Sequence, residues 1–338
     1  MIIPKKAPGQ AVSIIEPPPI DFDDFARFFR SIDNTLPTEE ILMLQKQSVK
    51  WIQKCNCGSV IYGEPRIGKT RAIYYIKEKL RERYGDELPI YEWDCTYHMG
   101  KSNTDKFFYT EIMRSIGLPD PPARDSAQTL KKRIINSMLV TAAQTKYKNL
   151  ILFIDEAQLL TERDYLFLID LYNNLDRDNV FLITFLVGQP ELLAIRRSFR
   201  ESGKGQIIGR FMNEDFEFRG INSRNSMAFL LSTIDTKLEY YVDGDRINIT
   251  RTFFPGSYSA GNNLVACGDS IWQAFQQVNG TNKIKSKDVP MHYFINALLE
   301  CFMEYGAVNG GSGIFPDIGG FIKCIESTGY KNRGFTAA

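Results

Sequence analysis

The sequence lacks several features that would assign it to whole classes of protein. Its 338 residues include no run of roughly 18 apolar residues, so we expect no membrane-spanning helix. Residues 1–6 carry no apolar signal core, which favours a cytoplasmic protein. The two histidines, His98 and His292, stand far apart. The one close cysteine pair, Cys55 and Cys57, has the wrong spacing for a zinc knuckle, so we expect the six cysteines to be reduced, structural thiols.

The chain also lacks an excess of charge of either sign. It has 41 basic and 40 acidic residues, a net charge of +1. Proteins that coat nucleic acid are often strongly basic, so the total charge does not indicate such a partner, although a local basic patch would suffice. Hydrophobic residues make up 43% and charged residues 24%, which is ordinary for a soluble globular protein. The length predicts about two domains.

The most informative stretch is residues 63–70, which read Gly-Glu-Pro-Arg-Ile-Gly-Lys-Thr. They follow a short apolar run at 59–62 and precede a helical pattern at 71–80, so the order is strand, glycine loop, helix. Backbone N–H groups of such a loop, at a helix N-terminus, bind the phosphates of a nucleotide. We therefore predict an ATP site formed by Gly63, Glu64, Pro65, Arg66, Ile67, Gly68, Lys69, Thr70 and Arg71.

A second stretch supplies the chemistry that this loop lacks. Residues 149–156 contain an apolar run at 150–154 that ends in Asp155 and Glu156, the pattern of a buried parallel strand with two carboxylates at its tip. Asp155 and the hydroxyl of Thr70 are predicted to hold Mg²⁺, while Lys69 reaches the outer phosphates. Glu156 is predicted to deprotonate the attacking water. Together the two stretches predict an Mg²⁺-dependent ATPase.

Further strands are predicted at 88–95, 180–187 and 215–218. The strand at 180–187 ends in Gly-Gln-Pro, and a polar side chain there would lie between Asp155 and the γ-phosphate. Gln189 is therefore a candidate for positioning water, although a plain turn residue would give the same pattern.

Composition divides the chain into four segments. Residues 1–37 form a proline-rich extended arm followed by an aromatic docking segment around Phe25, and 38–219 form the nucleotide-binding core, which opens with a helix from 38 to 54. Residues 220–305 form a helical lid, with helices at 225–241, 264–278 and 288–305 and a loop or small hairpin at 242–263. Residues 306–338 are glycine-rich, which predicts a poorly packed tail around a short helix at 318–327.

The order of these motifs resembles the AAA+ ATPases of the TniB/TnsC type, which regulate DNA transposition; the phage Mu B protein and ExeA-type ATPases lie nearby. The resemblance covers roughly residues 40–240 and rests on the loop at 63–70, the Asp-Glu-Ala-Gln-Leu-Leu run at 155–160 and the Gly-Gln-Pro-Glu-Leu-Leu run at 188–193. It implies an α/β fold, an AAA+ P-loop core with a five-stranded parallel sheet plus a small C-terminal helical lid. It also implies that Gln189 is the first sensor and that Arg210 is an arginine finger acting on a neighbouring subunit. The arginine that commonly serves as a second sensor has no counterpart at residues 261–264.

The same resemblance implies a DNA-binding surface after the second strand. In the transposition regulators this loop and nearby helix starts follow the DNA backbone on the inner face of the oligomer. Here Lys101, Ser102, Lys106 and Arg124 supply charge and hydrogen-bond donors for phosphates, with a solvated loop as the alternative.

These expectations lead to one function and several alternatives. The protein is predicted to form a ring or helical filament on double-stranded DNA when it binds ATP, to recruit or activate a transposase, and to be released by hydrolysis. A target-selector protein or guide-RNA complex is an implied partner, and no membrane is. The alternatives are an ExeA-like or helicase-loader-type ATPase, and a nucleotide-gated adaptor with little turnover.

Overall fold

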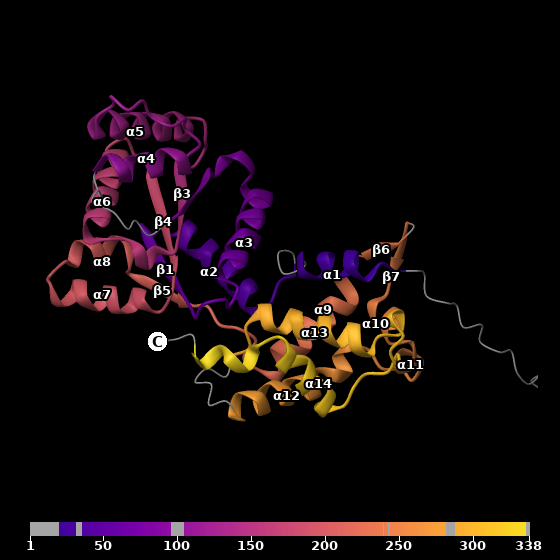
Figure 1. Cartoon of the computed structure of the whole chain (residues 1–338). Coiled ribbons are helices and arrows are strands. Elements are labelled where there is room, and N and C mark those ends of the chain that lie inside the picture. Colours follow the sequence, from indigo (N-terminus) through magenta and orange to yellow (C-terminus); the bar gives the residue numbers. More distant parts are fainter. Residues whose placement is uncertain are drawn as a thin grey trace, which may run out of the picture.

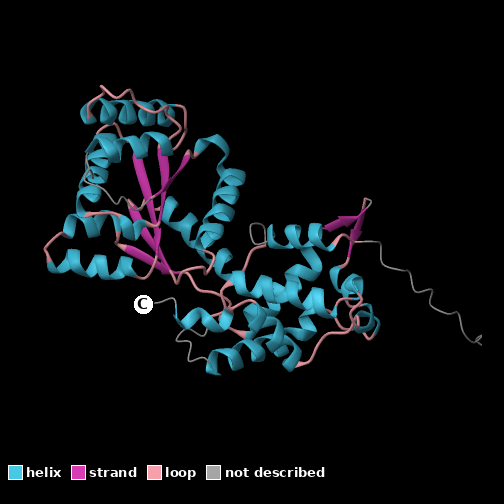
Figure 2. Cartoon of the chain, viewed as in Figure 1, coloured by secondary structure: helices cyan, strands magenta, loops and turns pink. Residues whose placement is uncertain are grey.

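The computed structural model describes residues 20–31, 36–95, 105–238, 240–242, 244–281 and 288–335. Figure 1 shows two bodies, a sheet flanked by helices and a bundle of helices, which meet where the chain leaves the sheet. Figure 2 shows that the strands lie in the first body, apart from one small hairpin in the second. The predicted arm at 1–19 lies outside the described residues.

The sheet has five strands in the order β2-β3-β4-β1-β5. Their bounds are β1 Gly58–Tyr62, β2 Ile90–Asp94, β3 Asn149–Asp155, β4 Phe181–Gly188 and β5 Glu214–Glu217. Every adjacent pair is parallel, and β5 forms one edge. The predicted α/β fold with a five-stranded parallel sheet is therefore confirmed.

Helices cover both faces of this sheet because its central strands are apolar on both sides. Along β3, Leu150, Leu152 and Ile154 pack on one face, while Ile151 and Phe153 pack on the other. The second face is covered by α2 Glu39–Gln53 and α3 Lys69–Tyr84. The first is covered by α4 Asp105–Ser115, α5 Ala127–Ala143, α6 Glu162–Asp176, α7 Glu191–Glu201 and α8 Gly205–Phe211 (Figure 1).

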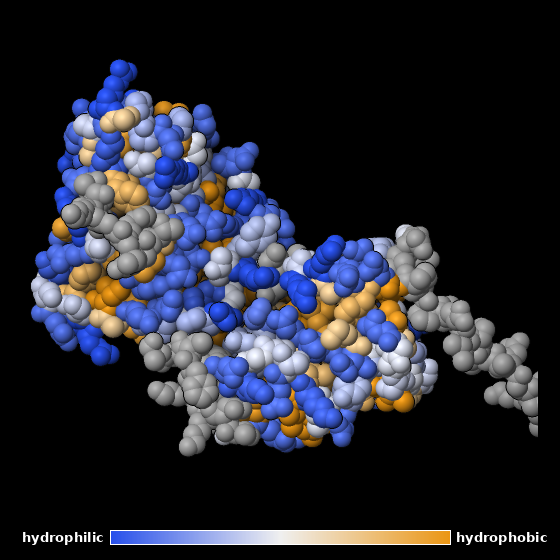
Figure 3. Space-filling model, in the orientation of Figure 1, coloured by the Kyte–Doolittle hydropathy of each residue, from blue (hydrophilic) through white to orange (hydrophobic). Residues whose placement is uncertain are grey.

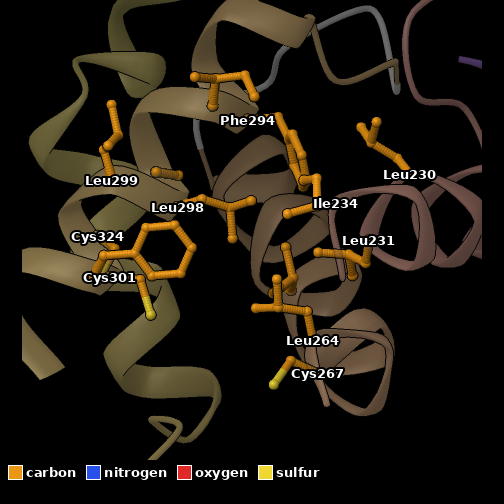
Figure 4. Packing of buried hydrophobic residues seen from close by; sticks show 14 of the residues in the cluster. Leu230, Leu231, Ile234, Leu264, Cys267, Phe294, Leu298, Leu299, Cys301 and Cys324 are labelled. Carbon is orange, nitrogen blue, oxygen red and sulfur yellow. The ribbon is translucent and has the colours of Figure 1, made fainter. Parts of the chain in front are cut away.

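The helical body has its own buried core. It contains α9 Arg224–Lys237, α10 Ile249–Phe253, α11 Pro255–Ser259, α12 Gly268–Thr281, α13 Met291–Tyr305 and α14 Ile318–Ser327. Figure 4 shows leucines of α9 and α13 pointing toward one another, with Cys301 of α13 beside Cys324 of α14. The N-terminal helix α1 Phe22–Ser31 also packs here, because Phe25 and Phe29 are fully buried in this core.

Three parts of the helical body differ from the sequence-based expectations. The segment 242–263, predicted as a loop or small hairpin, contains two short helices, α10 and α11. Helix α9 ends at Lys237 rather than Tyr241, and the chain continues as an antiparallel hairpin of β6 Tyr240–Val242 and β7 Asp245–Ile247. The described residues after 306 are not poorly packed, because Phe321 and Ile325 of α14 and Tyr330 are buried in the core of the helical body. Gly310, Gly313 and Gly329 have positive φ and serve turns between packed segments, whereas Gly319 and Gly320 lie within α14.

The visible face of the molecule is mostly hydrophilic, with scattered hydrophobic patches over both bodies (Figure 3). Among the described residues, none of the helices is both long and apolar enough to cross a bilayer.

Candidate functional site

The predicted site residues follow strands that end at the same edge of the sheet. Tyr62, the last residue of β1, is in register with Gly188, the last residue of β4. The N–H of Gly63 donates to the carbonyl of Gly188 over 3.2 Å, so the loop after β1 begins beside the loop after β4. Because the strands are parallel, Asp155 at the end of β3 lies at this edge too.

The loop at 63–68 holds its shape through two different backbone requirements. Gly68 has a φ of 110°, which favours glycine, and Arg66 has a φ of 60°. Gly63 instead needs space, because a Cβ there would overlap the backbone carbonyl of Phe218. Glu64, Pro65 and Arg66 are exposed at the rim of the loop, while Ile67 and Lys69 are buried.

Lys69 at the start of α3 points back into this loop. Its Nζ donates to the carbonyls of Gly63 over 2.7 Å and Glu64 over 2.9 Å. Burial lowers the pKa of the Lys69 ammonium, and the nearby carboxylates of Glu156 and Asp155 oppose that shift. The ammonium is thus held among carbonyls and carboxylates at the mouth of the loop.

Thr70 and Asp155 form a pair that fits a divalent cation bound together with phosphates. Thr70 Oγ1 donates to Asp155 Oδ2 over 2.8 Å, and the N–H of Glu156 donates to Asp155 Oδ1 over 2.9 Å. Burial raises the pKa of Asp155, while the hydrogen bond from Thr70 opposes the increase. Mg²⁺ usually takes one or two protein oxygens and completes its shell with water and phosphate oxygens, which is what this pair offers. In the described part of the chain, no three His, Cys, Asp or Glu side chains gather into a metal site.

Glu156 and Gln189 meet at the same edge. Glu156 has a φ of 51°, in the left-handed region that non-glycine residues rarely adopt and that is common at functional sites. Gln189 Nε2 donates to Glu156 Oε2 over 3.4 Å. Gln158, which the motif analysis did not assign a role, donates to the same carboxylate.

A cavity of about 440 Å³ opens beside the phosphate loop, between the two bodies. Gly68 and Arg71 line it from the core, and Ser226 and Met291 line it from the helical body. Its volume suits a small ligand, and its place next to the loop suits the nucleoside part of a nucleotide. Sequence analysis missed this wall because Thr38, Phe218 and Met291 are far apart along the chain and carry no motif.

The cavity also shows where the segment predicted to lack a second-sensor arginine lies relative to the site. Residues 261–264, where an arginine was expected and absent, do not contribute to its lining; the arginines that do are Arg71 and Arg219. The guanidinium of Arg219 also has an ionic contact with Asp288 over 3.6 Å, and the backbone N–H of Arg219 donates to Glu40 Oε1 over 3.3 Å.

Arg210, the predicted arginine finger, lies away from its own phosphate loop. It is the penultimate residue of α8, and its carbonyl lies against Gly58 at the start of β1. Its guanidinium is 5.1 Å from the centre of the Tyr172 ring, and its Nη1 is buried with no hydrogen-bond partner among the described residues. The side chain is thus at the opposite end of β1 from Gly63.

Two of the predicted DNA-binding residues lie side by side. Lys106, near the start of α4, donates from Nζ to the carbonyl of Ala123 over 2.6 Å, and Arg124 is the next residue and is exposed. Lys101 and Ser102 lie outside the described residues.

Comparison with known proteins identifies the fold. Residues 54–195, which include the phosphate loop, Asp155, Glu156 and Gln189, match a family model described as an AAA domain. This part of the chain is therefore similar to AAA domains. No curated protein matches the sequence.

Solved structures match over nearly the whole chain. The Aeropyrum pernix ORC2 protein in ADPNP-ADP complexes is 14% identical, with a TM-score of 0.53 over 93% of this chain and 70% of that one. The ADP form of the same protein is 13% identical, with a TM-score of 0.50 over the same shares. At this identity the likeness shows the fold alone, which is the AAA+ P-loop ATPase fold. The narrower resemblance to transposition regulators stays a prediction.

Proposed function

We propose that the protein is an Mg²⁺-dependent ATPase that assembles on double-stranded DNA and regulates transposition. The ATPase part of the proposal rests on one observation: three groups of side chains meet at one edge of the sheet. These are the Lys69 ammonium, the Thr70–Asp155 pair and the Glu156–Gln189 pair, all beside a nucleoside-sized cavity.

Each residue has a defined task in hydrolysis. Lys69 would leave its loop carbonyls to contact the phosphates. Thr70 and Asp155 would hold Mg²⁺, which would neutralise charge on those phosphates. Glu156 accepts a proton from water as the water oxygen bonds to the γ-phosphorus. The bond from that phosphorus to the bridging oxygen breaks, the electron pair stays on ADP, and phosphate leaves. Gln189 orients the water.

The assembly part of the proposal rests on charge placement and on motif order. Lys106 and Arg124 form a small basic surface next to α4, and such side chains contact DNA phosphates whatever the sequence. We propose that ATP bridges neighbouring subunits into a ring or filament on duplex DNA. This assembly recruits or activates a transposase, under a target-selector protein or guide-RNA complex, and hydrolysis releases it.

The decisive experiment compares wild type with Glu156→Gln by electron microscopy on duplex DNA with ATP. The amide keeps the shape of the carboxylate but accepts no proton, so ATP binds while turnover falls by at least about 100-fold. We expect rings or filaments threaded by duplex to persist with this variant, and to dissolve with wild type as ATP is consumed. Lys69→Ala is the control and should lose nucleotide affinity.

The outcomes of this experiment distinguish the proposed function from its alternatives. Unassembled monomers of Glu156→Gln with bound ATP and DNA would favour an adaptor or a helicase-loader-type ATPase. Near-normal hydrolysis by this variant would refute the assignment of the base.

A further inference from the structure

Gln158 connects two parts of the site that are far apart in the chain. It lies in a short 3-10 turn, Ala157–Leu159, which directly follows the left-handed Glu156. That turn directs the side chain back toward the sheet edge. There Nε2 donates to Glu156 Oε2, and Oε1 accepts the backbone N–H of Gln189 over 3.1 Å.

Both amide side chains act on the same oxygen of Glu156. Gln189 Nε2 also donates to Oε2, over 3.4 Å, so two N–H groups engage one carboxylate oxygen. The other oxygen, Oε1, accepts no hydrogen bond that the structure gives for the described residues. The arrangement therefore fixes the rotation of the carboxylate and leaves one oxygen available for water.

Gly188 makes this arrangement possible. A Cβ at this position would overlap Gln158 Oε1 and would lie 2.8 Å from Leu192 Cδ1. Gly188 has no positive φ, so the requirement is for space and not for an unusual backbone conformation. The close approach of Gln158 Oε1 to Gly188 is thus possible only because Gly188 has no side chain.

We propose that Gln158 is a positioning residue, which holds the Glu156 carboxylate in the orientation needed to accept a proton from water and ties it to the backbone of Gln189. The proposal rests on Glu156 being the base of the proposed ATPase. Gln158 does not touch the nucleotide in this scheme; it acts through Glu156, and a movement of the loop after β4 would change the orientation of the base.

The test uses Gln158→Glu in the full-length chain. This change keeps an oxygen to accept the Gln189 N–H but replaces the donor to Glu156 with a second carboxylate oxygen. We expect kcat to fall at least about tenfold with nucleotide affinity within about twofold of wild type. The acidic limb of the pH–kcat profile should move to higher pH, because a neighbouring like charge favours protonation of the base. Gln128→Glu, an exposed site on α5, is the matched control and should leave all three quantities unchanged.

A second pair of variants tests the contact itself. Gly188→Ala and Gln158→Ala should each lower kcat, and the double variant should lose less than the product of the two losses, because both remove one contact. Thermal unfolding and nucleotide binding confirm that each variant is folded.

Two outcomes would overturn the inference. In the first, Gln158→Glu has the kcat and pH profile of wild type while Glu156→Gln is inactive. This result would exclude a role for Gln158 but would keep Glu156 as the base. The other is normal turnover by Glu156→Gln itself, which removes the base and the positioning role together.

Discussion

Gly63 and Gly68 are both required by the shape of the loop that we propose binds phosphates, but for different physical reasons. Gly68 adopts a φ of 110°, and the nearest atom to an added Cβ is 3.9 Å away, so the constraint there is conformational. At Gly63 the constraint is steric, because the backbone carbonyl of Phe218 occupies the space of a side chain. Phe218 directly follows β5, so its backbone carbonyl cannot move without disturbing the edge of the sheet.

Gly63→Ala is therefore expected to destabilise the protein even without nucleotide. Overpacking of this kind costs about 1–3 kcal/mol, measured as a lower free energy of unfolding in urea. Gly209→Ala is the control, since a Cβ there meets nothing within 4 Å on α8 and alanine favours helix. Equal stability of Gly63→Ala and wild type would show that the Phe218 backbone gives way easily.

Sequence analysis found the residues of the site that stand on local motifs. Several site residues could be placed together because each lies at or after the end of a recognisable buried strand, and parallel strands end at one edge. These residues are Lys69, Thr70, Asp155, Glu156 and Gln189. The cavity wall could not be predicted in this way, because no local sequence pattern places Met291 on the same cavity as Gly68. The role of Gln158 depends on a left-handed turn that the sequence does not reveal.

At the scale of elements, local sequence signals predicted the bounds of α2 and α14 closely but misplaced the end of α9. Thr38 caps α2 as expected, its Oγ1 accepting the N–H of Ile41 over 3.2 Å. Helix α9 was predicted to run on to Tyr241, but it ends at Lys237 because Tyr240 pairs in a hairpin and packs on Phe25 and Phe28 of α1. Packing between elements distant in the chain overrides local helical preference there.

Helix α1 is held mainly by aromatic contacts. Phe25 is fully buried, with its ring centre 4.5 Å from that of Phe253 and 5.3 Å from that of Tyr240. Such offset and tilted pairs add to the burial of the ring itself. The docking predicted for the aromatic segment thus takes place within this chain, against α10 and the β6–β7 hairpin.

Phe25→Ala should lower the free energy of unfolding by about 3–5 kcal/mol, the usual cost of emptying a buried aromatic site. Arg30→Ala, at an exposed site of the same helix, should change it by less than about 0.5 kcal/mol. Hydrogen exchange of α1 amides would show whether the helix detaches on its own. A loss below about 1 kcal/mol for Phe25→Ala would mean that α1 contributes little to the fold.

For the whole molecule, the proposed DNA-binding surface can be tested through salt dependence. Lys101→Ala and Lys106→Ala should weaken duplex binding about equally for all sequences. Each should lower the slope of log affinity against log salt by ~1 if it neutralises one phosphate. Fluorescence anisotropy with a labelled duplex measures both quantities. Unchanged slopes in both variants would move the DNA path elsewhere.

The structure orders the remaining basic candidates for such a path. Lys131 is paired with Asp170, and Arg133 is paired with Asp125 over 2.6 Å, so these two cations already have acidic partners. Arg124 and Lys132 are exposed and have no ion-pair partner that the structure gives for the described residues. Arg124→Ala is therefore the next variant to measure, with Arg133→Ala as its control.

Assembly is the remaining property proposed for the whole molecule, and that proposal depends on Arg210. Its backbone lies at Gly58, and the five residues of β1 separate it from the phosphate loop by ~16 Å, so it cannot serve its own nucleotide. Among the described residues, Arg210 also has no ion pair with Glu214 or Asp215, the acidic residues that follow it in the chain: Glu214 accepts from Trp51 Nε1 over 2.9 Å, and Asp215 pairs with Arg196 over 2.7 Å.

Arg210 therefore has two remaining roles that predict different results. If its guanidinium reaches the γ-phosphate of a neighbour, it stabilises both the interface and the charge that builds up in the transition state. Arg210→Ala would then bind ATP, lose ~10³-fold or more in hydrolysis and fail to assemble on DNA. If it only stacks on Tyr172, the variant would lose about 0.5–2 kcal/mol of stability and hydrolyse ATP normally.

Mixing of two inactive variants separates these roles, because an in-trans residue can be supplied by another subunit. Arg210→Ala keeps an intact nucleotide site, and Lys69→Ala keeps an intact guanidinium, so mixed oligomers should recover hydrolysis that neither shows alone. Recovery should vary with the mixing ratio and be greatest near equal amounts, where the largest number of complete interfaces forms. If mixed oligomers form but stay inactive, another arginine is the finger. Arg197 and Arg200 on α7 are then the first to test, because both are exposed, whereas Arg196 is held by Asp215.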